Sequence, residues 1–156
     1  MGSNSIWHAF FCILTLTISV TDACQCRERK TYNEKLCSSD FVISTKVADK
    51  GECLEQTPLY CLKKIYRLKL FWVIKKNKHS KQLLKRGNAK IVTSPAGRGL
   101  CGFRLIQNVI YLMVGKVSED SNDLSLHRCI SIVKPSSRTE RNSIRYNLHR
   151  CRRKQN

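Results

Sequence analysis

Acidic residues are scarce in this chain. Its 156 residues include 29 Lys or Arg against 11 Asp or Glu, which gives a formal net charge of +18 at pH 7. Between Glu55 and Glu119 there are fourteen basic residues and no acidic one. A charge balance of this kind argues against basic partners and favours polyanions.

Long apolar runs are also missing. The longest one, residues 6–20, contains no charged side chain and is short for a bilayer span of roughly 20 residues. Thr21 and Ala23 follow it as the small residues that a signal peptidase reads. We therefore expect residues 1–23 to be a signal peptide rather than a membrane anchor, no membrane span elsewhere, and a secreted protein located in the extracellular space or matrix.

Side chains and motifs typical of catalytic sites are sparse as well. Beyond residue 23 the histidines are His79, His127 and His149, and none lies in a recognisable nucleophile motif or an H-E-x-x-H motif. The chain has no N-x-S/T sequon, so N-glycosylation is not expected. We expect that the protein is not an enzyme.

Cysteine, in contrast, is abundant. Cleavage after Ala23 would leave 133 residues, enough for one domain, with 29 basic residues against 10 acidic ones. The remaining cysteines are even in number, which predicts four disulfides in a secreted chain: Cys24, Cys26, Cys37, Cys53, Cys61, Cys101, Cys129 and Cys151. Zinc ligation by thiolates is the weaker alternative, because the paired C-x2-C units of structural zinc modules are absent. Of the possible pairs, only a local clip between Cys53 and Cys61 is suggested by spacing.

The periodicity is mainly that of β-strands. Five strands are predicted, which suggests a small closed or nearly closed barrel: residues 40–47, 65–74, 89–94, 108–117 and 123–133. In the second strand Tyr66, Leu68, Leu70, Trp72 and Ile74 share one face at period two, and we expect Tyr66, Trp72 and Tyr111 to be core residues.

The chain changes character after Pro135. Ser137 and Glu140 have the S-x-x-E spacing of a capping box, and few β-branched residues follow. We expect a C-terminal helix packed on the barrel. The predicted organisation is a signal peptide (1–23), one domain (24–151) and a basic tail (152–156).

Two basic segments are candidates for polyanion contact. The first contains Lys75, Lys76, Lys78, Lys81, Lys85 and Arg86, and the second is "HRCRRK" at 149–154. In a secreted protein the expected partners are heparan sulfate or other extracellular polyanions rather than nucleic acid, through the same counterion-release electrostatics. The alternative is a solvated face that serves solubility alone.

Several ordered motifs resemble the inhibitory N-terminal domain of the tissue inhibitors of metalloproteinases, a netrin-like module. They are "CQC" (24–26), "LCSSDFVISTKV" (36–47), "SPAGRGLCG" (94–102) and "YLMVGKV" (111–117). The resemblance covers Cys24 to Cys151 and is that of a single-domain member without the family's second, six-cysteine domain. It implies a five-stranded barrel of the oligonucleotide/oligosaccharide-binding type (OB-fold) with flanking helices. It also implies a set of disulfides: Cys24–Cys101, Cys26–Cys129, Cys37–Cys151 and, as an addition to the family's pattern, Cys53–Cys61.

The resemblance implies a mechanism too. In this family the α-amino nitrogen and carbonyl oxygen of the first cysteine chelate the catalytic zinc of the target protease, so Cys24 would do so here, with no cofactor of the protein's own. Gln25 would enter the specificity pocket, and a contact ridge would include Cys26, Gly99, Leu100 and Cys101. Gln25 replaces the family's usual Thr or Ser, and Gly99-Leu100 replaces a Ser-Val-type pair.

A second function class is compatible with the same module. Netrin-like domains also occur as matrix or glycosaminoglycan-binding modules without protease inhibition. A free N-terminal cysteine at the predicted cleavage site favours the inhibitor, because a binding module has no need of one.

Overall fold

Strands make up most of the regular structure. The computed structural model describes residues 24, 26–28, 30–84, 88–97 and 100–153. The strands in these ranges are β1 (Phe41–Val47), β2 (Glu52–Gln56), β3 (Cys61–Lys76), β4 (Asn88–Thr93), β5 (Ala96–Gly97), β6 (Leu100–Cys101), β7 (Ile110–Val117), β8 (Leu124–Leu126) and β9 (Ile132–Pro135). The helices are α2 (Tyr32–Cys37), α3 (Lys78–Leu83) and α4 (Arg138–Arg153). The predicted signal peptide, residues 1–23, lies outside the described residues.

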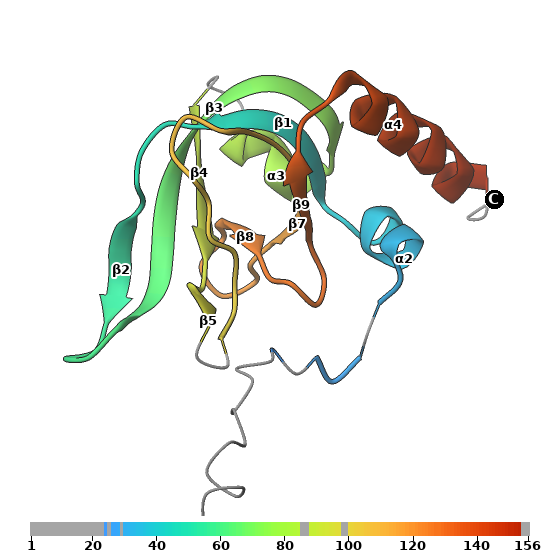
Figure 1. Ribbon diagram of the computed structural model, residues 1–156. Coiled ribbons are helices and arrows are strands. Elements are labelled where there is room, and N and C mark those ends of the chain that lie inside the picture. Colours follow the sequence, from blue (N-terminus) through green and yellow to red (C-terminus); the bar gives the residue numbers. More distant parts are fainter. Residues whose placement is uncertain (1–23, 25, 29, 85–87, 98–99, 154–156) are drawn as a thin grey trace, which may run out of the picture.

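Five strands close into a barrel. Their hydrogen-bonded order is β1–β3–β4–β8–β7, and β7 pairs with β1 again to complete the circle. All these pairings are antiparallel except the parallel pair of β4 and β8. Outside the circle, β9 extends the sheet beside β7, and β2 forms a hairpin arm with β3 that projects from the barrel (Figure 1). The predicted five-stranded barrel with flanking helices is confirmed.

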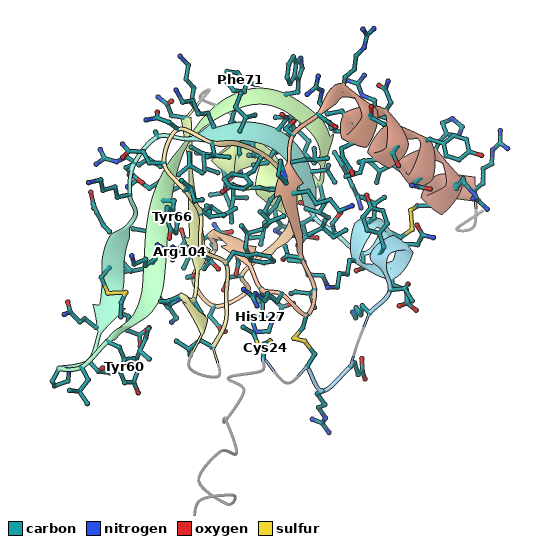
Figure 2. The ribbon with its side chains drawn as sticks, in the orientation of Figure 1. Cys24, Tyr60, Tyr66, Phe71, Arg104 and His127 are labelled. Atoms are coloured by element: carbon teal, nitrogen blue, oxygen red, sulfur yellow. A yellow bond between two sulfur atoms is a disulfide. The ribbon has the colours of Figure 1, made fainter. Side chains whose placement is uncertain are left out.

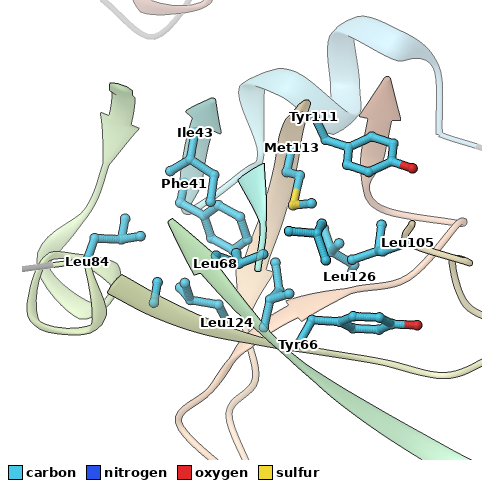
Figure 3. Close-up of a cluster of buried hydrophobic side chains, with 13 residues drawn as sticks. Phe41, Ile43, Tyr66, Leu68, Leu84, Leu105, Tyr111, Met113, Leu124 and Leu126 are labelled. Atoms are coloured by element: carbon cyan, nitrogen blue, oxygen red, sulfur yellow. The ribbon is translucent and has the colours of Figure 1, made fainter. Parts of the chain in front are cut away.

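The barrel interior is filled by apolar side chains from every strand of the circle (Figure 3). The core residues include Phe41, Ile43, Tyr66, Leu68, Leu84, Ile91, Leu105, Tyr111, Met113, Leu124 and Leu126. Burying one such side chain contributes about 1.5–3 kcal/mol, so this cluster of buried residues strongly stabilises the barrel. Tyr66 and Tyr111 are buried, as the sequence predicted.

A second apolar cluster lies between the outside of the barrel and the helices. It consists of Leu36, Val42, Leu112, Val114, Ile132 and Ile144. Ile144 of α4 is fully buried there, and at the start of the helix the amide of Glu140 donates to Ser137 Oγ at 3.0 Å. The C-terminal helix predicted after Pro135 is therefore present and packs on the barrel.

The prediction that Trp72 belongs to the core is wrong. Its side chain is 49% exposed, and the guanidinium carbon of Arg141 lies 4.6 Å from its ring centroid. The cause is a register shift, because Thr45 pairs with Leu70 while the neighbouring Ser44 pairs with Trp72. One extra residue in β3 inverts the alternation of faces, which turns Leu70 toward the core and Trp72 away from it.

The strand predicted at 123–133 is also wrong as a single element. It consists of β8 and β9 separated by a turn, in which the amides of Ile130 and Ser131 donate to the carbonyl of His127 at 3.0 and 2.8 Å. His127 follows β8 rather than lying within a strand. Within the described part of the chain, no helix is both long and apolar enough to cross a membrane.

Candidate functional site

Two disulfides lie side by side where the N-terminal segment meets the barrel. Cys24 is bonded to Cys101 and Cys26 to Cys129. The Sγ atom of Cys24 lies 3.9 Å from that of Cys26 and 3.9 Å from that of Cys129. Figure 2 shows Cys24 at one end of the barrel, beneath His127. The first described residues are thus anchored by two disulfides whose N-terminal cysteines are separated by one residue.

The sulfur atoms themselves do not form a metal site in this state. All four Sγ atoms lie within 4.8 Å of one another, the only group of three or more potential ligands among the described residues. Each sulfur is held in a disulfide, however, and zinc sites in proteins use the thiolate. The cluster is therefore a covalent clamp.

The partner of Cys24 belongs to a short hairpin of β5 and β6. Cys101 pairs with Ala96, and its carbonyl accepts a hydrogen bond from the amide of Arg128 at 2.8 Å. Gly102 follows directly, and a Cβ there would overlap the backbone carbonyl of Ser94. Only glycine permits this approach of two backbones, so the position of Leu100–Cys101 beside the N-terminus depends on Gly102.

The partner of Cys26 belongs to the turn between β8 and β9. The amide of Cys129 donates to His127 Nδ1 at 3.3 Å, which requires an unprotonated nitrogen there. Burial lowers the pKa of His127, and the charge of Lys35 lowers it further. Both effects favour the neutral imidazole that accepts this bond.

Lys35 connects the same turn to helix α2. Its Nζ donates to the carbonyls of Arg128 at 2.5 Å and Ser131 at 3.5 Å. Burial lowers the pKa of Lys35. No local sequence pattern marks Lys35 as a site residue, because its partners are backbone carbonyls more than ninety positions away.

The structure brings several of the predicted site residues together. Cys24, Cys26, Leu100 and Cys101 lie at one edge of the molecule, each half-buried. Gln25 and Gly99 lie outside the described residues. The edge therefore combines a doubly anchored N-terminal segment with a short rigid hairpin.

The other two disulfides lie elsewhere. Cys37–Cys151 joins α2 to the end of α4, and Cys53–Cys61 spans the β2–β3 arm. The four observed pairs are those that the family resemblance implies. Four disulfides in a chain of this size are typical of proteins in oxidising compartments such as the extracellular space.

The predicted polyanion residues have different environments. Lys75 Nζ donates to the carbonyls of Leu36 and Cys37 at 3.3 and 3.0 Å, so it satisfies the carbonyl end of α2. The other members that the structure describes are exposed: Lys76, Lys78 and Lys81. Lys85 and Arg86 lie outside the described residues.

Comparison with known proteins gives one finding that covers nearly the whole chain. The profile of a family described as tissue inhibitor of metalloproteinase matches residues 22–153. The matched range includes every described strand and helix and all four disulfides. No curated protein sequence matches the chain.

Proposed function

The chain belongs to the tissue inhibitor of metalloproteinase family, and we propose that it is a secreted inhibitor of zinc metalloproteinases that chelates the zinc of its target through Cys24. Proteins of this family are inhibitors rather than enzymes. In the proposed organisation, residues 1–23 are removed as a signal peptide, residues 24–151 form the inhibitory domain and residues 152–156 form a basic tail.

The observation that carries the proposal is the pair of adjacent disulfides at residues 24 and 26. A chain terminus ordinarily frays, and ordering it on binding costs free energy. Two disulfides, one to β6 and one to the 127–131 turn, remove most of the conformational freedom of this segment before it binds a protease. Such pre-organisation is what a terminus that acts as a ligand requires.

The chemistry of the terminus suits a catalytic zinc. Cleavage after Ala23 would give Cys24 a free α-amino group, whose reference pKa of about 7.7–8.0 allows a metal to displace its proton at neutral pH. The amino nitrogen and the carbonyl oxygen of Cys24 would occupy the position that a protease keeps open for water. The sulfur takes no part in coordination, because it is bonded to Cys101.

Neighbouring residues would then set the contact with the protease. Gln25 is proposed to enter the specificity pocket beside the zinc, and Gly99, Leu100 and Cys101 to form a ridge next to it. The described part of that ridge is held by backbone bonds, since β6 pairs with β5 and Arg128 donates to Cys101. This rigidity supports a role as a preformed contact surface.

The test changes the zinc-facing atoms and leaves the fold unchanged. Adding one Ala before Cys24, or acetylating its α-amino group, converts the donor nitrogen into an amide that does not coordinate zinc. We expect the inhibition constant against a matrix metalloproteinase catalytic domain to rise by roughly 100-fold or more, since a metal ligand is lost. A variant with one Ala added after Asn156 is the matched control and should inhibit like the unmodified protein.

Two further measurements make the result decisive. Intact mass of the secreted protein should place its first residue at Cys24. Gln25→Gly should weaken inhibition less than the amide variants do, because the chelate persists. Equal inhibition by the extended and unmodified proteins would refute the chelation mechanism and leave a binding-only netrin-like module as the function.

A further inference from the structure

A groove on the outside of the barrel brings together basic residues that are far apart in the sequence. It runs between α4 and the end of β3 and has a volume of about 280 Å³. Its lining includes Ile74 and Lys75 from β3, and Arg145, Leu148 and His149 from α4. The two basic segments noted in the sequence, around residues 75 and 149, thus meet in one place.

Trp72 and Arg141 extend this lining by one helical turn. Trp72 is half exposed beneath the guanidinium of Arg141, whose Nη1 also donates to Ser136 Oγ at 3.2 Å. Arg141 and Arg145 are four residues apart on α4, so they share a face and lie about 6 Å apart along the helix axis. We call the surface formed by Trp72, Ile74, Lys75, Arg141, Arg145, Leu148 and His149 the α4 groove.

The charge of the α4 groove has one sign. None of its lining residues is acidic. The single acidic residue of α4, Glu140, has Lys134 as an ion-pair partner at 3.5 Å. A neighbouring hollow adds Arg150 and Arg153 beside Tyr146. The positive potential therefore continues along the length of the helix.

Lys75 gives the groove a fixed positive charge. Its ammonium group is held by the carbonyls of Leu36 and Cys37 and by Ser39 Oγ, so its position is set before any ligand arrives. A cation held in this way costs little additional side-chain entropy on binding. Arg145 and His149 on the opposite wall are exposed and available for direct contact.

We propose that the α4 groove binds an extended sulfated polysaccharide. Sulfate groups match the row of cations, while the apolar floor and the exposed indole ring fit the flat faces of sugar rings. The four disulfides favour an extracellular ligand over nucleic acid. A concave groove also suits a single chain better than the flat surface of a bilayer.

The proposal does not depend on protease inhibition. Cys24 lies at one end of the barrel, whereas α4 packs on its outside, and the two are well apart in the shared orientation of Figures 1 and 2. A glycan in the α4 groove would leave the N-terminal edge uncovered. The protein can therefore be retained on a matrix polysaccharide while its inhibitory edge faces a protease.

The test compares two variants that lose the same charge. Arg141→Gln/Arg145→Gln removes two cations from the groove. Lys50→Gln/Lys90→Gln removes two exposed cations near Tyr66 and Arg67. Tyr66 is eight residues along β3 from Ile74, which corresponds to at most about 26 Å at the strand rise. Binding of a heparin octasaccharide to the secreted protein is measured by calorimetry over a range of salt concentrations.

We expect the groove variant to bind about tenfold more weakly at physiological salt, and the slope of log K against log salt to fall by about two. The Lys50/Lys90 variant should change affinity less than twofold. Arg145→Glu, which keeps the Arg141–Trp72 contact, provides a second groove variant and should also weaken binding. Equal thermal midpoints would show that each variant is folded.

Three outcomes would overturn the proposal. Equal losses in the groove and control variants would mean that binding reflects total charge alone. No loss in either groove variant would place the ligand elsewhere. Tighter binding to a single-stranded oligonucleotide, or to vesicles containing phosphatidylserine, with the same dependence on Arg141 and Arg145, would assign the groove to that other class of ligand. Protease inhibition should be unchanged in all variants, whichever outcome is found.

Discussion

The Cys53–Cys61 disulfide should be far less important for stability than the Cys37–Cys151 disulfide, although both are covalent bonds of the same kind. Cys53–Cys61 closes a loop with a sequence separation of 8, and Cys37–Cys151 one of 114. In the chain-entropy description, these loops correspond to about 2.5 and about 4.8 kcal/mol of stabilisation. A domain of this size has a total free energy of unfolding of about 5–15 kcal/mol. Loss of the Cys37–Cys151 disulfide would therefore remove nearly all the stability of a domain at the lower end of that range.

The surroundings of the two bonds support the same ranking. Every residue of β2 is exposed, and β2 pairs only with β3, so the Cys53–Cys61 clip lies outside both apolar clusters. Cys37–Cys151, in contrast, joins α2 to α4 next to the cluster that contains Leu36 and Ile144. Loss of the clip should loosen the arm and leave the barrel intact.

The assay is urea unfolding of the two double-serine variants, followed by tryptophan fluorescence. Trp72 is the only tryptophan after residue 23, and its contact with Arg141 makes it sensitive to the docking of α4. For Cys53→Ser/Cys61→Ser we expect the midpoint to fall by roughly 1–2 M urea and inhibition to be retained. Cys37→Ser/Cys151→Ser should be largely unfolded or close to it. Equal destabilisation by the two variants would refute the reasoning, because the β2–β3 arm would then be part of the cooperative core.

Two further predictions concern the segments that hold the N-terminal edge. Gly102→Ala should destabilise the domain by about 2–4 kcal/mol in the same urea assay, because its Cβ would overlap the carbonyl of Ser94; a change below about 0.5 kcal/mol would contradict this packing. Burial, and then the charge of Lys35, lower the pKa of His127, so the unfolded chain binds the proton more readily than the folded one. The contribution of the neutral His127 side chain to the free energy of unfolding should therefore be fully present above pH 6.5, the ordinary histidine pKa being about 6.5. This contribution should be lost as the pH falls from there toward the lowered pKa of the folded state. His127→Asn, which keeps an acceptor near the Nδ1 position, should remove that part of the pH dependence of unfolding, and an unchanged profile would count against it.

Local sequence patterns were sufficient for much of the fold. The predicted strands at 40–47, 89–94 and 108–117 agree with β1, β4 and β7 within one or two residues. β1 and β7 are buried on both faces and are therefore short, largely apolar runs with β-branched residues, whereas β4 partly alternates between buried and exposed residues. Both patterns indicate a strand without reference to distant residues. The S-x-x-E spacing at Ser137 likewise indicated the start of α4, since a cap depends on residues only three positions apart.

Features that depend on pairing between distant segments needed the tertiary structure. Trp72 faces outward because β3 shifts register against β1, which its own alternation does not reveal. Lys75 belongs to the predicted polyanion cluster, yet its ammonium group binds the carbonyl end of α2. The family resemblance supplied the cysteine pairs, but only the fold showed that Cys24 and Cys26 stack against each other.

The sequence by itself therefore determined the strand content, the excess of positive charge and the cysteines that identify the family. The tertiary structure decided where those charges and cysteines act. Closure of β7 on β1, the bonds from the 127–131 turn to Cys26 and Cys101, and the packing of α4 each join residues dozens of positions apart. Such contacts depend on the free energy of the whole barrel, which no short stretch of sequence encodes.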